Sequence, residues 1–111
     1  MTKRPQVYLP DECIYSCSTC HSHVACHDSI ISKVSSGKHG PGYLVDEVVN
    51  VGMGEREERV LPSGPHIIAD IYCCVCHATI GWKHIIASKE EERYKDGLWM
   101  IEQTRVVKER L

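Results

Sequence analysis

The chain has 111 residues, of which 42% are hydrophobic, 25% are charged and 6% are aromatic. This length fits one globular domain and excludes a large multidomain enzyme. The formal net charge is −2 at pH 7, and no extended stretch of basic residues indicates nucleic acid as a partner. A domain of this size that lacks phenylalanine needs stabilisation beyond its hydrophobic core, and its seven cysteines point to a metal ion or to disulfides.

The sequence also carries information about the compartment. No apolar run reaches the length of a secretion signal or the ~20 residues of a membrane span, so we expect an intracellular protein without a membrane partner. Thiols stay reduced in such a compartment, and an odd number of cysteines fits metal binding better than complete disulfide pairing.

The N-terminal half contains two segments that we expect to lack regular structure. Residues 1–12 include two prolines and show no periodicity, so we expect an N-terminal arm that is partly disordered. Three glycines and a proline predict a loop over residues 35–42. Apolar and polar residues then alternate over residues 43–51, which predicts a strand that ends at Gly52.

The remaining elements are predicted in this order: a solvated strand at 55–61, a turn at 62–65, strands at 66–72 and 79–87, a short helix at 89–95 capped by Ser88, a strand at 98–107 and a C-terminal tail at 108–111. Many short strands separated by turns, with little helix, predict an all-β fold with antiparallel pairing. We expect a single domain over residues 13–107.

Two cysteine pairs give the strongest chemical signal in the sequence. Cys17 and Cys20 form one Cys-x-x-Cys motif, and Cys73 and Cys76 form a second. This spacing lets a tight turn direct both sulfur atoms at one ion, and four thiolates are the usual ligands of a structural zinc ion. The sequence therefore predicts one Zn²⁺ per chain that joins two turns separated by 52 residues.

Three further cysteines and several histidines lie close to these pairs in the sequence: Cys13, Cys26, Cys74, His21, His23, His27 and His77. One interpretation is a second metal site built from Cys26 and neighbouring histidines. The other is that these are small buried or surface side chains, since their spacings match no compact zinc-binding pattern. We expect the thiol of Cys74 to point away from the ion and to pack as a small hydrophobic group.

Besides the cysteine pairs, a series of short motifs stands in a fixed order along the chain: Ile31-Ser32-Lys33, Gly40-Pro41-Gly42-Tyr43-Leu44, Val48-Val49-Asn50-Val51, Gly64-x-His66, Asp70-Ile71, Gly81-Trp82-Lys83 and Arg93-Tyr94-Lys95-x-Gly97. Together they resemble the Yippee domain over about residues 13–103. The resemblance implies a zinc-stapled β-tent, in which two antiparallel sheets meet near the metal. This fold is similar to that of the C-terminal domain of cereblon, of Mis18 proteins and, more distantly, of type B methionine sulfoxide reductases.

The resemblance also sets expectations about function. It implies a non-catalytic protein-interaction module, acting as an adaptor or substrate-recognition component of a ubiquitin-ligase or cell-division-associated complex. It implies protein partners, and a location in the nucleus and cytoplasm, with the centrosome or mitotic apparatus as a further site.

Two other functions stay open from the sequence. The first is a groove for a small molecule or peptide lined by His66, Tyr72 and Trp82, because Trp82 matches one tryptophan of the ligand cage in the cereblon relatives. The second is a thiol-based reductase that uses Cys26 or Cys74. His84 stands where the family usually has tyrosine, which we interpret as repacking.

Overall fold

The computed structural model describes residues 7–35 and 41–110 of the chain. Within these residues the strands are β1 (Cys13–Cys17), β2 (His23–Cys26), β3 (Ile30–Ser35), β4 (Pro41–Val45), β5 (Val51–Leu61), β6 (Gly64–Cys73), β7 (Thr79–Ala87), β8 (Trp99–Glu102) and β9 (Val106–Arg110). The short 3-10 helices in these same ranges are η1 (His27–Ser29), η3 (Glu90–Lys95) and η4 (Gln103–Arg105). No helix in this part of the chain is long and apolar enough to cross a membrane.

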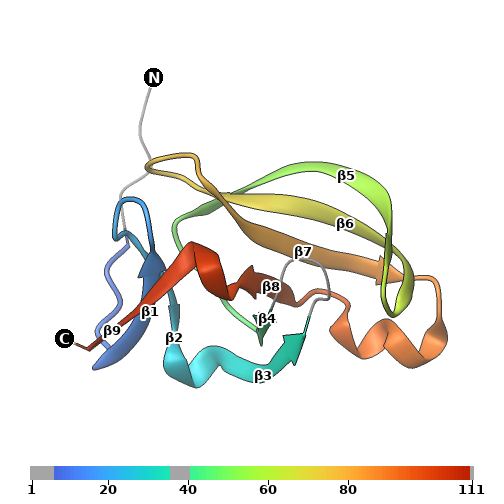
Figure 1. Cartoon of the computed structure of the whole chain (residues 1–111), viewed down its shortest axis with the longest axis horizontal. Coiled ribbons are helices and arrows are strands. Elements are labelled where there is room, and N and C mark those ends of the chain that lie inside the picture. The colour runs from blue at the N-terminus through green and yellow to red at the C-terminus, as the bar shows by residue number, and fades with distance from the viewer. Residues whose placement is uncertain (1–6, 36–40, 111) are drawn as a thin grey trace.

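The strands form two antiparallel sheets, which confirms the predicted fold class. The smaller sheet has the order β2-β1-β9, and the larger has the order β3-β4-β8-β7-β6-β5. Figure 1 shows the smaller sheet at the left of the molecule, while strands β5, β6 and β7 run across its upper part as a long layer. The chain passes between the two sheets at η1, which leads from β2 in the smaller sheet to β3 in the larger one, and returns at η4, which leads from β8 to β9.

Buried side chains form two clusters. The larger one contains residues from both sheets: Tyr15, Cys17, Val24, Ala25, Tyr43, Val45, Ile71, Cys73, Ile80, Ile101 and Val106. The second belongs to the larger sheet alone and contains Leu44, Ile68, Trp82 and Met100. Alternate residues of a strand point to opposite faces, so strands such as β4 and β6 supply both clusters.

Strands β7 and β8 approach each other unusually closely at Gly81. A Cβ atom at this position would lie 1.9 Å from the carbonyl oxygen of Met100. Only glycine fits there, because that distance is far inside van der Waals contact. The glycine next to Trp82 is therefore a packing requirement of the larger sheet.

The predicted strand over residues 43–51 is wrong in its extent. Strand β4 ends at Val45, and Asn50 adopts a φ of 59°, which turns the chain before β5 begins. Strand β5 runs through Gly52, where the ring of Tyr72 fills the space that a side chain would need. Alternation alone cannot reveal this turn. Part of the predicted loop, residues 36–40, lies outside the described residues, and Pro41 opens β4.

The C-terminal expectations need two corrections, although the strand at 79–87 is confirmed as β7. Ser88 does not cap a helix, because η3 begins at Glu90 after Lys89 and no side chain caps it. The expected strand at 98–107 is two strands, since η4 interrupts it and moves the chain between sheets. Residues 108–110 belong to β9 and pair with β1, so they are not a tail.

Candidate metal centre

The first cysteine pair lies in the turn between β1 and β2. The N–H of Cys17 donates to the carbonyl oxygen of Ser22 at 2.8 Å, and the N–H of His21 donates to the carbonyl oxygen of Cys17 at 2.8 Å. These bonds close a tight turn around Cys20. Backbone hydrogen bonds therefore hold both cysteines on one tight turn.

The second cysteine pair lies in an equivalent turn between β6 and β7. The N–H of Cys73 donates to the carbonyl oxygen of Ala78 at 2.9 Å, and the N–H of His77 donates to that of Cys73 at 2.8 Å. His77 has a φ of 64°, and His21 at the same place in the first turn has a φ of 63°. Histidine is one of the residue types that adopt this left-handed conformation more often than most. Both histidines thus close their turns.

The two turns bring four sulfur atoms together. The Sγ atoms of Cys17 and Cys76 are 3.6 Å apart, and those of Cys20 and Cys73 are 3.5 Å apart. All four atoms lie within 4.8 Å of one another. A tetrahedral ion with metal–sulfur bonds of about 2.3 Å places its ligands just under 4 Å apart, so the cluster has the size of a Zn²⁺ site. The two turns lie next to each other at the upper left of Figure 1.

The pKa values of two thiols in the cluster, Cys20 and Cys76, are shifted in opposite directions. Burial, followed by hydrogen bonds to the other thiols, raises the pKa of Cys76 to about 12. Burial acts in the same direction at Cys20, but hydrogen bonds from Ser22, whose Oγ is 3.1 Å from the sulfur, outweigh it and lower that pKa to about 6. A cation must therefore displace protons from this cluster when it binds.

The remaining cysteines and histidines do not form a second cluster. In residues 7–35 and 41–110, no other group of three potential ligands converges. The ring of His27 instead contacts the hydroxyl of Tyr15 at 3.3 Å, and Nδ1 of His23 accepts a hydrogen bond from the N–H of Leu9 at 2.8 Å. Cys74 lies outside the four-sulfur cluster, as expected, and is half-buried.

Comparison with known proteins decides the family. The family described as "Yippee zinc-binding/DNA-binding /Mis18, centromere assembly" matches residues 13–111. The chain belongs to the Yippee/Mis18 family. Its relatives include protein yippee-like 3 of Oryzias latipes, 47% identical over 94% of this chain and 88% of that protein. Another is protein yippee-like 4 of Rattus norvegicus, 46% identical over 97% of this chain and 86% of that protein.

A solved structure of the family shares the fold. The crystal structure of the Mis18 "Yippee-like" domain has a TM-score of 0.71 and covers 89% of this chain and 96% of that one, at 12% identity. The Yippee zinc-binding family and the four converging cysteines together establish one Zn²⁺ as the cofactor. When bound, the ion supplies a cross-link between the two turns, and all four of its coordination positions are filled by protein sulfur.

The three residues predicted to line a groove lie in different surroundings. Trp82 is buried and lines a cavity of about 380 Å³ on the larger sheet. His66 does not line that cavity: its Nδ1 bonds the carbonyl oxygen of Gly64 at 2.8 Å, and its ring stacks edge-on against that of His84. Tyr72 lies beside Gly52 and also stays outside the cavity.

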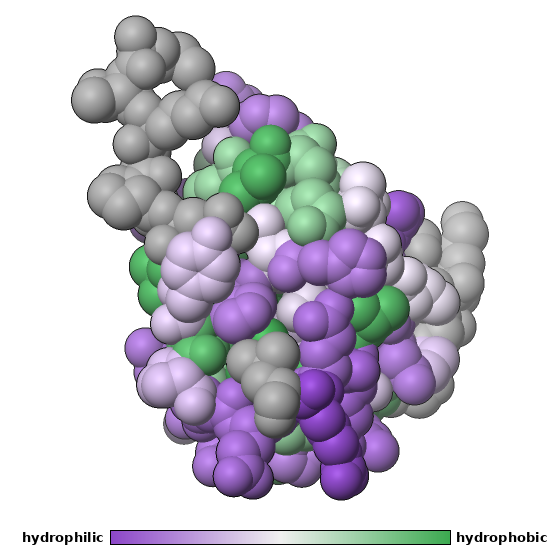
Figure 2. Space-filling model, turned by 90° about the vertical axis from the view of Figure 1, so that its left-hand side faces the viewer, coloured by the Kyte–Doolittle hydropathy of each residue, from purple (hydrophilic) through white to green (hydrophobic). Residues whose placement is uncertain are grey.

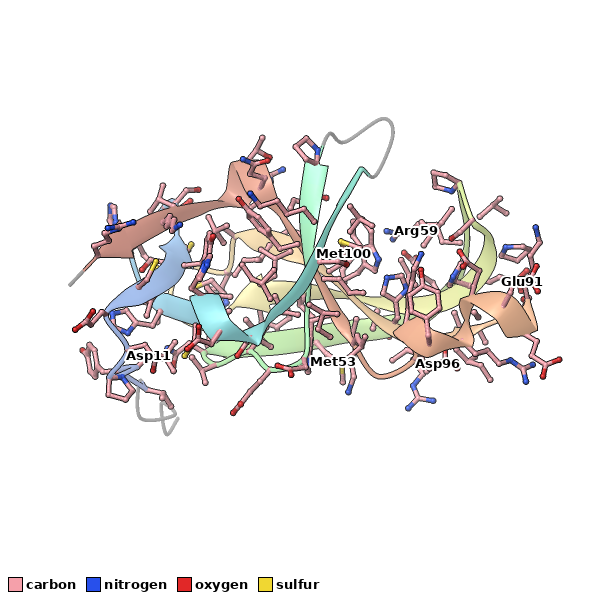
Figure 3. The ribbon with its side chains drawn as sticks, turned by 90° about the horizontal axis from the view of Figure 1, so that it is seen from below. Asp11, Met53, Arg59, Glu91, Asp96 and Met100 are labelled. Atoms are coloured by element: carbon pink, nitrogen blue, oxygen red, sulfur yellow. The ribbon has the colours of Figure 1, made fainter. Side chains whose placement is uncertain are left out.

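The cavity is lined by apolar and charged residues from five strands of the larger sheet, the β5–β6 turn and η3. Leu61, Val34, Trp82 and Met100 supply its apolar surface, and Arg59, Asp70, Lys95 and Glu102 supply its charges. Figure 3 shows Arg59 and Met100 on the same side of the ribbon, where β5 and β8 border this space. Arg59 is itself paired with Glu57 and with Asp70, so it is not an isolated cation.

The sequence analysis missed His84 as a cavity residue. It is 1% exposed, and within the described part of the chain neither of its ring nitrogens has a hydrogen-bond partner. Burial, and then the neighbouring His66 and Lys95, lower its pKa to about 4, so the ring is neutral at pH 7. The signal was present, because residues two apart on a strand share a face and Trp82 is two residues away.

Proposed function

We propose that this chain is a non-catalytic interaction module that acts as an adaptor or substrate-recognition component in a ubiquitin-ligase or cell-division-associated complex. The observation that carries the proposal is the complete protein coordination of the metal by Cys17, Cys20, Cys73 and Cys76, which leaves no position for a substrate. The ion then fixes the arrangement of the two sheets, and binding takes place on the surface that they present. Its proposed locations are the nucleus and cytoplasm, including the centrosome and mitotic apparatus.

An exposed apolar pair supports a protein partner. Ile67 and Ile86 lie opposite each other on β6 and β7 and are 38% and 43% exposed. Directly opposed side chains act as a unit, and aliphatic groups of this kind are typical of the central part of a protein interface.

The test is affinity purification of the tagged full-length chain from dividing cells, compared with an Ile67→Glu/Ile86→Glu variant. We expect ubiquitin-ligase or cell-division proteins to be enriched with the unaltered chain and lost with the variant. Ile31→Glu is the matched control, since Ile31 is 53% exposed, lies on β3 and does not line the cavity. Equal recovery from all three chains, or the absence of both classes of protein, contradicts the proposal.

The thiol chemistry of the other cysteines supports the absence of catalysis. Burial, and then Asp11, raise the pKa of Cys26 to about 11, which keeps it a thiol rather than a nucleophilic thiolate at neutral pH. We propose that nucleic acid is not a partner either, because the chain has a net charge of −2. Binding of duplex DNA at low salt, weakening steeply as salt is raised, would contradict this second point.

The cavity at Trp82 supports a second candidate function, the binding of a small molecule. Its indole Nε1 is buried and, among the described residues, has no hydrogen-bond partner. Buried donors are normally satisfied, so an acceptor group on a ligand is a natural partner for this one. Native mass spectrometry with cyclic imides and uridine tests it: an adduct lost in Trp82→Ala supports the function, and no adduct with any compound contradicts it.

A further inference from the structure

The side chain of Asn50 binds the main chain of the N-terminal segment. Its Oδ1 accepts a hydrogen bond from the N–H of Val7 at 2.8 Å, and its Nδ2 donates to the carbonyl oxygen of Val7 at 2.8 Å. The same Nδ2 also donates to the carbonyl oxygen of His23 at 2.8 Å. Asn50 thus offers Val7 one donor and one acceptor, as a neighbouring strand would.

A third hydrogen bond continues this pattern. The N–H of Leu9 donates to Nδ1 of His23 at 2.8 Å. In an extended chain, the polar groups of residues i and i+2 point to the same side, so Val7 and Leu9 present one edge of a strand. Asn50 and His23 together therefore bind three successive main-chain groups, which is the recognition mode of β-strand addition built from side chains.

Asn50 and His23 together form a receptor for this segment, and the rest of the fold holds Asn50 in place. Asn50 adopts a left-handed φ of 59°, its carbonyl oxygen accepts a hydrogen bond from the N–H of Cys74 at 2.8 Å, and the adjacent Val49 donates to Val24 at 2.8 Å. The first of these bonds ties Asn50 to the second metal turn, and the other ties its segment to β2. The amide is therefore positioned before any peptide arrives, which lowers the entropic cost of binding.

In the segment that occupies the receptor, the side chains of Val7 and Tyr8 are exposed rather than buried in the fold. Val7 is 45% exposed and Tyr8 is 72% exposed, and Tyr8 contacts the fold edge-on at the ring of His23, with centroids 5.7 Å apart. The surface at this end of the molecule is largely hydrophilic in its lower part, with hydrophobic atoms gathered above (Figure 2). Binding through main-chain atoms is independent of side-chain identity, so another extended segment can take the same place.

We propose that Asn50 and His23 form a receptor for an extended peptide of a partner protein, and that residues 7–9 occupy it in cis and compete with that peptide. The peptide needs free N–H groups at two positions two residues apart, so proline is excluded at both. This inference rests on the contacts of Asn50 and His23, and the ligase or cell-division role proposed above can fail without affecting it.

The test uses a variant of the full-length chain in which residues 7–9 no longer occupy the receptor. Val7→Pro/Leu9→Pro removes both arm donors without altering the receptor. A peptide with the sequence of residues 4–12 is titrated into this variant and into the unaltered chain, and the backbone amide signals of His23 and Cys74 are followed by NMR. We expect at least tenfold tighter binding to the variant, because the arm in the unaltered chain competes at high effective concentration.

Three controls distinguish main-chain recognition from nonspecific binding. The same peptide N-methylated at the residue corresponding to Val7 should bind at least tenfold more weakly, whereas replacing its tyrosine by alanine should change affinity less than threefold. Asn50→Gly in the emptied background, which keeps the left-handed backbone accessible, should also lose binding while zinc content is retained.

Three results would overturn the proposal. One is equal binding of the peptide to the emptied and unaltered chains. Another is unchanged affinity of the N-methylated peptide. The third is a concentration-dependent dimer of the unaltered chain, seen by analytical ultracentrifugation and abolished by Val7→Pro/Leu9→Pro, because the occupant would then be a second copy of this chain.

Discussion

At the scale of single residues, the cysteines divide into four that converge and three that do not. The distances of 3.5 and 3.6 Å between sulfur atoms of different turns separate the two groups. The sequence predicted this division correctly, because Cys-x-x-Cys spacing is a local property of a turn. The conformations of His21 and His77 and the hydrogen bond from Ser22 could not be predicted, since they depend on how each turn closes.

Replacing one metal ligand should unfold the domain. Structural zinc binding contributes on the order of 10 kcal/mol, which is comparable to the total stability of a small domain. Cys17→Ser and Cys73→Ser should therefore lose zinc and their cooperative thermal transition. Cys13→Ser and Cys74→Ser, outside the cluster, should retain both. If all four variants melted alike and held the same zinc content, the assignment of ligands would be wrong.

His84 should make stability depend on pH. Its pKa is about 4 when folded and close to 6.5 when unfolded, so between these values the unfolded chain binds a proton that the folded chain does not. Stability should thus fall as pH falls, by about 1 kcal/mol between pH 7 and 5.5. His84→Tyr should reduce this loss in urea titrations at both pH values. Zinc content must be equal at both, and an identical pH dependence in the two chains would contradict the assignment.

At the scale of strands and turns, β-branched and aromatic residues predicted β7 correctly, whereas alternation of apolar residues failed where the chain turns. The segment that includes Asn50 carries valines at alternating positions, yet it bends because Asn50 is left-handed and Val49 bonds to β2. The helix η4 interrupts the last predicted strand for a similar reason, since the second half of that segment pairs with β1. Such long-range pairing leaves no mark in local periodicity.

Gly81→Ala should disrupt the contact between β7 and β8. The added carbon would lie 1.9 Å from the carbonyl oxygen of Met100, a backbone atom that cannot move without separating the strands. We expect a loss of more than about 3 kcal/mol, as for overpacking of a rigid core. Gly54→Ala is the control, because its nearest contact would be 3.6 Å. Similar urea midpoints for the two variants would mean that the strands adapt.

At the scale of the whole molecule, the zinc centre joins the two sheets, which the hydrophobic core joins only in part. One buried cluster spans both sheets, whereas the cluster around Trp82 and Met100 belongs to the larger sheet alone. The sequence predicted two sheets joined by a metal, and it predicted a groove at Trp82, which does line the cavity. The other walls of that cavity and the receptor at Asn50 could not be predicted, because both arise from segments that meet only after folding.

Removal of zinc should therefore loosen the smaller sheet first. With a strong chelator, amide hydrogen exchange should accelerate in β1 and β2 well before it does in β7 and β8, whose own cluster remains buried. The cooperative thermal transition of the whole domain should be lost, as in the cysteine variants that cannot hold zinc. Uniform acceleration in all strands would indicate that the two sheets unfold as one unit.

The pairing of β1 with β9 has a consequence for the order of events during synthesis. All four cysteine ligands are made before Val106, at which β9 begins. Because a chain leaves the ribosome N-terminus first, these ligands also emerge before β9, and zinc can bind while the smaller sheet still lacks one of its three strands. The ion then holds β1 and β2 beside the larger sheet until β9 emerges and completes their own.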